Sequence, residues 1–187
     1  VFFRPLPVRS TSSTISSETK YKGHIINVRV DTVAMPDNRT AFRDIVDHPG
    51  GVGIVPLLDD NKVIMVKQFR KPIEKVIYEI PAGKLDYGEP HYECGVRELE
   101  EETGFKAKEF VFLGHMYPTP GFANETTYLY LAKGLYQGNI HSDEDEYLDV
   151  EIMPIETVLQ MIMNNEINDA KTVFGIFKTL ELLKNNL

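Results

Sequence analysis

The most informative stretch of this 187-residue sequence is GKLDYGEPHYECGVRELEEETGF, residues 83–105. It predicts a helix from Pro90 to Thr103. Pro90 suits the helix start because its missing N–H would have no partner there, and Gly104 suits a left-handed helix end. Successive residues of a helix rotate by about 100°. The side chains that share one narrow stripe, and that we expect to face the core, are Tyr92, Val96, Leu99 and Thr103.

Three glutamates crowd along another side of this predicted helix. Glu98 and Glu102 share one face because they are four residues apart, and Glu101 lies beside Glu98 on the far side from Glu102. Like charges at this spacing destabilise a helix by about 0.2–0.5 kcal/mol, which pairs of Arg97 with Glu93 and Glu101 partly offset. A hard divalent cation reverses the effect, because it binds several carboxylate oxygens together. Spacing alone leaves two alternatives open, an exposed acidic face and a Mg²⁺ site.

The whole composition is that of an ordinary globular protein. Apolar residues make up 42% of the chain, and 10 Phe with 9 Tyr exclude disorder throughout. Because 28 Asp and Glu outnumber 20 Lys and Arg, we expect no nucleic-acid partner. We also expect no membrane association, because the longest apolar stretch, residues 51–58, is too short to cross a bilayer and the N-terminus lacks a signal-peptide pattern. The single Cys excludes a disulfide framework and fits a reducing, cytoplasmic location.

Short strands and helices are interspersed along the chain. Strands are expected at residues 25–33, 40–47, 51–58, 62–69, 76–80, 109–113, 127–132 and 150–153. Amphipathic helices are expected at residues 155–164 and 169–184, with Asn168 and Asp169 as N-cap candidates for the second. This order predicts an α+β protein with a mixed sheet and helices packed on it. We divide the chain into a flexible lead-in, 1–13, an N-terminal β segment, 14–48, and a main domain, 49–187.

The pattern of residues 83–105 resembles the Nudix box at each of its nine defined positions. These positions are Gly83, Glu89, Arg97, Glu98, Leu99, Glu101, Glu102, Gly104 and Phe105. Nudix proteins hydrolyse a nucleoside diphosphate linked to another moiety, and their box forms a loop–helix–loop that binds divalent metal. The resemblance implies the Nudix fold for the main domain, an α/β/α sandwich with a mixed sheet. A small antiparallel β-hairpin or sheet in residues 14–48 precedes it.

Flanking motifs resemble the ADP-ribose pyrophosphatase branch of this family. They lie at residues 12–18, 68–70, 79–84, 117–125 and 169–172, and Pro120 stands fifteen residues after Phe105, where that branch has a proline. The resemblance implies hydrolysis of ADP-ribose to AMP and ribose 5-phosphate. The alternatives are a relative that cleaves another nucleoside diphosphate sugar and a sensor that binds ADP-ribose without cleaving it. Every box glutamate is present, which favours the enzyme.

The resemblance also assigns metal ligands. It implies that Glu98, Glu102 and the backbone carbonyl of Ala82 bind Mg²⁺, for which Mn²⁺ can substitute. Glu101 is a further ligand and belongs to the catalytic set. Arg97, in the same set, orients the glutamates rather than touching substrate.

A base that activates water comes, in this branch, from a loop outside the box. Residues 143–149 hold five carboxylates in that place. A solvated loop is the alternative for such a run of charge. Among these carboxylates we select Glu146, just before the next strand, as the base and Glu144 as the second choice.

Substrate contacts are implied at five positions, which are Arg70, Arg43, Gly83, Gly121 and Glu125. Arg70 follows a strand and can pair with a phosphate through its planar fork. Glu125 follows a Pro-Gly turn and can accept hydrogen bonds from the terminal ribose hydroxyls. Arg43 lies in the N-terminal hairpin and is placed to reach the substrate of a neighbouring subunit.

The N-terminal hairpin, residues 21–47, has a strand-period apolar face made by Ile26, Val28 and Val30. A two-stranded ribbon with such a face needs a surface to cover. Packing on its own subunit is one solution. The resemblance implies another, exchange of the N-terminal segment across a two-fold homodimer, so that it borders the partner's site.

Overall fold

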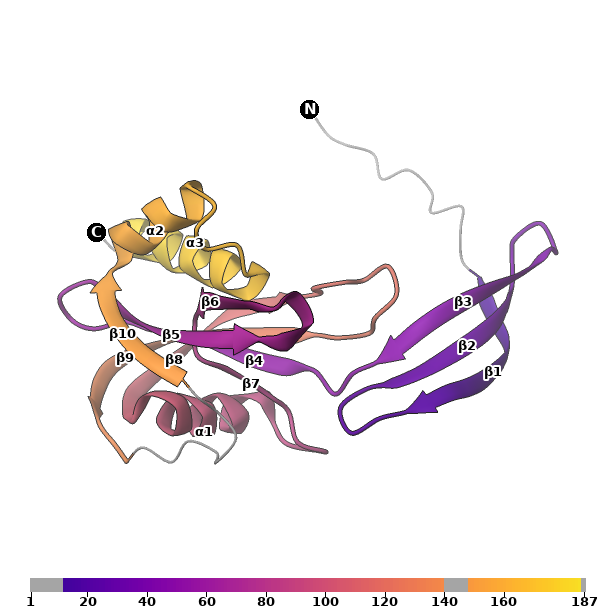
Figure 1. Ribbon diagram of the computed structural model, residues 1–187, viewed down its shortest axis with the longest axis horizontal. Helices are drawn as coiled ribbons and strands as arrows, with labels where there is room; N and C mark the ends of the chain where they lie inside the picture. The colour runs from indigo at the N-terminus through magenta and orange to yellow at the C-terminus, as the bar shows by residue number, and fades with distance from the viewer. Residues whose placement is uncertain (1–11, 140–147, 186–187) are drawn as a thin grey trace. The chain divides into compact units, whose positions relative to one another are not determined.

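The computed structural model describes residues 12–139 and 148–185 (Figure 1). These residues form two compact units. The first consists of residues 12–48 together with 119–125, and the second of residues 49–118 together with 126–139 and 148–185. Each unit has its own sheet structure and is described by itself.

The first unit is an antiparallel sheet in the order β1 (Ser13–Lys22), β2 (Asn27–Ala34) and β3 (Thr40–Asp47). The predicted hairpin of β2 and β3 is confirmed, and its register pairs Val28 with Val46. β1 was not predicted, because its Ser- and Thr-rich sequence lacks apolar alternation. The most protected side chains of β2 lie on the face opposite the expected apolar one of Val28 and Val30. They are Asp31 and Val33, each 4% exposed, and Asp31 forms an ion pair with Arg29.

Residues 119–125 complete the first unit, although they lie far beyond β3 in sequence. The amide of Val46 donates to the Phe122 carbonyl at 2.8 Å, and the Asn124 amide donates to the Val46 carbonyl at 3.2 Å. The Asn124 side chain accepts from the His48 amide at 2.9 Å and donates to Asp47 at 2.8 Å. The Pro-Gly turn is therefore fastened to the end of β3.

The described residues of the second unit form strands of two sheets. The strands are β4 (Gly51–Pro56), β5 (Lys62–Arg70), β6 (Lys75–Glu79), β7 (Ala82–Lys84), β8 (Phe105–Met116), β9 (Thr127–Gln137) and β10 (Leu148–Pro154), with a 3-10 turn at Lys71–Ile73. One sheet has the order β7-β4-β9-β8 and the other β10-β5-β6. β4 and β9 run parallel and the remaining pairs run antiparallel. The predicted mixed sheet is confirmed.

Helices cover both sides of these strands (Figure 1). α1 (His91–Thr103) lies on one side, and α2 (Ile155–Met163) with α3 (Ala170–Asn185) on the other. Each side has a core. The core under α1 includes Val52, Ile54, Cys94, Leu99, Tyr130 and Ala132. The core under α2 and α3 is larger and includes Val55, Met65, Ile80, Leu129, Ile155, Val158 and Ile176. None of the described helices has the length and apolarity that a membrane span needs.

Local signals set the helix ends as expected. Gly104 ends α1 in the left-handed region at φ 72°, with its N–H donating to the Glu100 carbonyl. The Asp169 side chain accepts from the Thr172 amide at 3.0 Å, which caps the start of α3. The predicted caps are therefore confirmed.

The predicted core stripe of α1 is wrong in its first half. Leu99 is fully buried, but Tyr92 is 50% exposed and Val96 lines a hollow on the outer side. Small residues hold the buried positions instead. A Cβ on Gly95 would come within 3.3 Å of the Val52 side chain, so the helix lies close against β4. A search for large apolar residues misses this kind of contact.

Candidate active site

The site is built around the strand that precedes α1. β7 pairs with β4, with Gly83 opposite Val52. The carboxylate of Glu98, from α1, occupies the space that a Cβ on residue 83 would fill. Glycine at this position therefore lets a carboxylate lie directly against the backbone of β7.

Glu102 reaches the same backbone from one turn further along α1. Its Oε2 accepts the Ala82 amide at 2.9 Å, and the residue is only 7% exposed. The alternative of an exposed acidic face is therefore wrong for Glu102, because this hydrogen bond draws the carboxylate under β7. Glu98 and Glu102 thus meet the backbone at Ala82 and Gly83.

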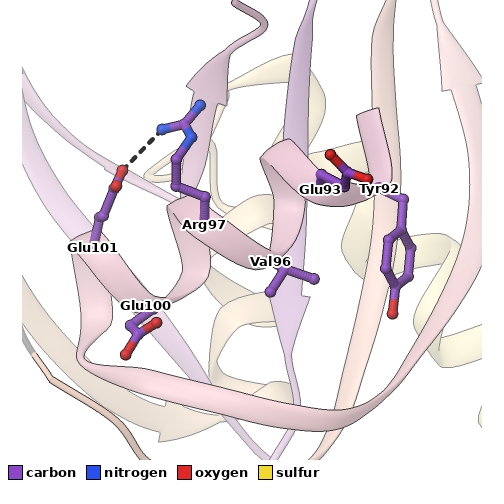
Figure 2. Close-up of a pocket in the computed structure, with 6 residues that line it drawn as sticks. All are labelled: Tyr92, Glu93, Val96, Arg97, Glu100 and Glu101. Carbon is purple, nitrogen blue, oxygen red and sulfur yellow. Dashed lines mark hydrogen bonds and ion pairs between the residues drawn. The ribbon is translucent and has the colours of Figure 1, made fainter. Parts of the chain in front are cut away.

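Arg97 gathers the other carboxylates of the box. Its Nε donates to Glu89 at 3.0 Å, and its Nη1 donates to Glu98 at 2.7 Å and to Glu101 at 2.8 Å. Arg97 therefore pairs with Glu89 and not with Glu93 as we expected. Figure 2 shows the pair of Arg97 and Glu101 on α1. The orienting role predicted for Arg97 agrees with these contacts.

Electrostatics keep Glu89 and Arg97 ionised. Hydrogen bonds from Arg97, the largest influence, outweigh burial and lower the pKa of the Glu89 carboxyl to about 2. The pKa of Arg97 is raised, first by its hydrogen bonds to Glu89. Glu89 therefore anchors Arg97 as a permanent cation, and Arg97 in turn holds Glu98 and Glu101.

The donor set at β7 suits a hard divalent cation. Glu98 and Glu102 offer carboxylate oxygens beside the Ala82 backbone, and such cations prefer oxygen ligands. Among the described residues no three His, Cys, Asp or Glu side chains converge as a metal cluster, and Glu101 faces Arg97. The features that suit a divalent cation here are the two carboxylates of Glu98 and Glu102 and the space beside Gly83.

A second cluster lies at the end of β5. Arg70 forms two hydrogen bonds with Glu79, Nε to Oε1 at 2.6 Å and Nη2 to Oε2 at 2.8 Å. Lys171, from α3, also contacts Oε2 of Glu79. Glu102 is among the charges that raise the pKa of Arg70, after its hydrogen bonds to Glu79. The Arg70 guanidinium is therefore influenced by the charge of Glu102, one of the two α1 carboxylates that lie against β7.

A shallow hollow of about 350 Å³ lies on the outer side of α1 (Figure 2). Its lining residues all come from α1 and are Tyr92, Glu93, Val96, Arg97, Glu100 and Glu101. It does not include Glu98, Glu102 or Arg70. The hollow therefore touches the outer rim of the carboxylate cluster and not its β7 side.

The remaining predicted substrate residues belong to the first unit. Arg43 is exposed and donates to the Phe42 carbonyl at 2.8 Å. Gly121 has nothing within 4 Å of the position of a Cβ, and Glu125 lies 3.9 Å from the His48 ring. These three residues therefore belong to the first unit, whereas Arg70, Gly83 and the predicted metal ligands belong to the second.

Both base candidates, Glu144 and Glu146, lie outside the described residues. The chain is described again at Leu148, which pairs with Gln68 in the β10–β5 ladder. Sequence reasoning gave no role to Glu79 or Lys171. The available signal was that both lie inside motifs, residues 79–84 and 169–172, that flank the box.

The fold and the site together define an α/β/α sandwich protein in which an acidic helix brings two carboxylates against a neighbouring strand. The chain belongs to the Nudix family, because the NUDIX domain model matches residues 47–174. A second model, the nucleoside diphosphate sugar hydrolase N-terminal domain, matches residues 13–51. The predicted family and fold are thereby confirmed.

Individual relatives cover most of the chain. An ADP-ribose pyrophosphatase of Bacillus subtilis (strain 168) is 42% identical over 87% of this chain and 89% of its own. A methanol dehydrogenase activator of Bacillus methanolicus has the same identity and coverage. The crystal structure of an ADP compounds hydrolase has a TM-score of 0.83 at 23% identity and covers 94% of this chain and 95% of that one. That structure has the same fold.

Proposed function

We propose that this protein hydrolyses the pyrophosphate bond of ADP-ribose, giving AMP and ribose 5-phosphate, with Mg²⁺ as its cofactor and Mn²⁺ as a substitute. The observation that carries the proposal is the meeting of Glu98 and Glu102 at the Ala82–Gly83 backbone. The similarity to an ADP-ribose pyrophosphatase over most of both chains supports the substrate.

The residues that would hold the cation are Glu98, Glu102 and the Ala82 carbonyl, joined by Glu101 when it leaves Arg97. A bound divalent cation neutralises phosphate charge and lowers the pKa of water. Arg97 keeps Glu98 in place through its Nη1, and Glu89 keeps Arg97 in place. The chain thus supplies an arrangement of carboxylates that exists before the substrate binds.

Arg70 and the carboxylate loop complete the proposed chemistry. Arg70 binds a phosphate through the guanidinium edge that Glu79 does not occupy. Glu146 removes the proton from the attacking water, with Glu144 as the alternative base. Leu148, the first residue of β10, pairs with Gln68, two residues before Arg70. This pairing supports the assignment, because the carboxylate loop leads into β10 beside the end of β5 that carries Arg70.

In this proposal the first unit supplies contacts to both the nucleoside end and the terminal ribose of the substrate. Arg43, Gly121 and Glu125 contact the substrate, with Glu125 accepting from the terminal ribose. The protein acts as a homodimer in which the N-terminal segment is exchanged between subunits. The match of residues 13–51 to a nucleoside diphosphate sugar hydrolase N-terminal domain supports this assignment.

A substrate panel tests the proposal. The purified protein is incubated with Mg²⁺ and ADP-ribose, GDP-mannose or ADP-glucose, and the products are separated and quantified. ADP-ribose should give the highest kcat/KM, with AMP and ribose 5-phosphate in equal amounts. A higher kcat/KM for another nucleotide sugar would establish the first alternative, and binding of ADP-ribose without any turnover would establish the sensor.

Light scattering tests the assembly. The full-length protein should have the mass of a dimer, and a chain that begins at Gly50 should have lost both the dimer and most of the affinity for ADP-ribose. A full-length monomer with normal turnover would contradict the exchanged dimer and leave the hydrolase assignment intact.

A further inference from the structure

The carboxylate of Glu79 is buried between two cations from distant parts of the chain. Glu79 is 1% exposed, and it contacts Arg70 at the end of β5 and Lys171 in the first turn of α3. A buried charge is costly unless it is paired and hydrogen-bonded. Burial, the largest single influence, raises the pKa of Glu79, but the hydrogen bonds and charges of Arg70 and Lys171 lower it overall. Glu79 is therefore an ionised, fully partnered carboxylate.

The contact with Glu79 uses only one edge of the Arg70 guanidinium. An arginine has five N–H donors in a planar fork, and Glu79 takes Nε and one donor of Nη2. The Arg70 side chain is 39% exposed, so part of it is open to solvent. The edge formed by Nη1 and the second donor of Nη2 has the spacing for a bidentate phosphate. Fixing one edge thus sets the direction of the other.

The first turn of α3 fixes Glu79 in turn. Lys171 also pairs with Asp169 at 3.1 Å, and Asp169 accepts from the Thr172 hydroxyl at 2.7 Å. The same hydroxyl accepts the Ile80 amide at 2.9 Å. Helix α3 therefore holds both Glu79 and the residue that follows it, two positions before Ala82.

We propose that Glu79, held by Lys171, is a positioning residue that aims the free edge of Arg70 at the pyrophosphate of the substrate. The inference rests on the proposed function, because that function supplies the pyrophosphate. An ion pair that served stability alone would be a weak solution, since buried pairs are often replaceable by apolar residues without loss. Positioning explains why the carboxylate occupies one edge and leaves the other.

A double-mutant cycle separates positioning from a structural role. Glu79→Gln, which keeps the shape and removes the charge, is made with Arg70 present and in an Arg70→Met background. The dissociation constant of inorganic pyrophosphate with Mg²⁺ is measured by calorimetry, and kcat and KM are measured with ADP-ribose. With Arg70 present, the Kd and KM should rise about ten-fold, the loss expected for one charged hydrogen bond, and kcat should change less. In the Arg70→Met background the same change should raise the Kd and KM by less than about two-fold.

Glu79→Asp guards against a variant that fails to fold. It keeps a negative charge between the two cations but withdraws the carboxylate from both Arg70 and Lys171 by one methylene. Positioning predicts weaker pyrophosphate binding and a raised KM below the Tm of the variant, where it is folded, whereas a purely structural role predicts a lower Tm with wild-type binding by the folded protein.

Three results would overturn the inference. They are equal effects of Glu79→Gln in both backgrounds, wild-type pyrophosphate binding by folded Glu79 variants, and no pyrophosphate binding by the wild-type protein. If the wild-type protein binds pyrophosphate but does not hydrolyse ADP-ribose, the proposed function fails on its own. The binding cycle then still decides whether Glu79 positions Arg70.

Discussion

Substitution of Gly83 by Ala should separate activity from stability. All three carboxylate atoms of Glu98 lie closer than 3.0 Å to the place that the new Cβ would take, whereas ordinary contact begins at 3.4 Å. The carboxylate must therefore move by on the order of 1 Å, and a misplacement of that size can lower a rate about 10²-fold. We expect kcat/KM for ADP-ribose to fall by about that factor. The Mg²⁺ concentration that gives half-maximal activity should rise.

The fold should tolerate the same change. The obstructing atoms are the end of a flexible side chain and not backbone, and Gly83 is not among the glycines with positive φ. Replacing Gly by Ala at a compatible position stabilises by about 0.4–1 kcal/mol, which offsets a weakened pair with Arg97 worth about 0–1 kcal/mol. The Tm measured without metal should stay within about 4 °C of the wild-type value.

Gly95→Ala is the matched control. It adds the same methyl group to the helix that carries Glu98, but toward Val52 and away from the carboxylates. We expect a changed Tm and near-normal turnover. A Gly83→Ala protein with wild-type kcat and wild-type Mg²⁺ dependence would refute the reasoning, because the displaced Glu98 would then have no part in binding the cation.

Three further predictions test the site. Glu102→Gln should keep the fold, because its amide oxygen can still accept from Ala82, but it should lose most turnover; near-normal kcat at saturating Mg²⁺ would contradict a metal ligand at this position. Glu146→Gln should lower kcat by about 10²–10⁴-fold with metal binding retained, and the base assignment moves to Glu144 if only Glu144→Gln shows that loss. Because the folded-state pKa of Glu89 is lowered to about 2, its contribution to stability is present above about pH 4.5 and is lost as the pH falls toward 2. The Tm of wild type should therefore exceed that of Glu89→Gln at pH 7 and approach it near pH 2, and parallel Tm curves across that range would be evidence against the Glu89–Arg97 pair.

Much of the architecture could be predicted because local signals agreed with one another. Gly104 and Asp169 mark helix ends through backbone and capping chemistry that acts within a few residues. The fully buried β4 appears as a continuous apolar run, and its expected range of 51–58 differs from the observed strand by two residues.

Other features could not be predicted because they depend on contacts between distant residues. Glu102 is drawn under β7 by the amide of Ala82, twenty residues away in sequence. Glu79 and Lys171 are separated by 92 residues, so no local pattern joins them. The burial of Gly95 reflects the close approach of α1 to β4. The absence of a side chain at Gly95 permits this approach but does not by itself predict it.

The attachment of residues 119–125 to the first unit has a consequence for folding during synthesis. Asp47 at the end of β3 is 77 residues away from its partner Asn124. At about 5–20 residues per second, a ribosome needs roughly 4–15 s to add that length of chain. The N-terminal sheet is thus made first but completed late, after the strands β4 to β8 have been synthesised. During that interval the polar groups at the end of β3 must be satisfied by water or by another chain.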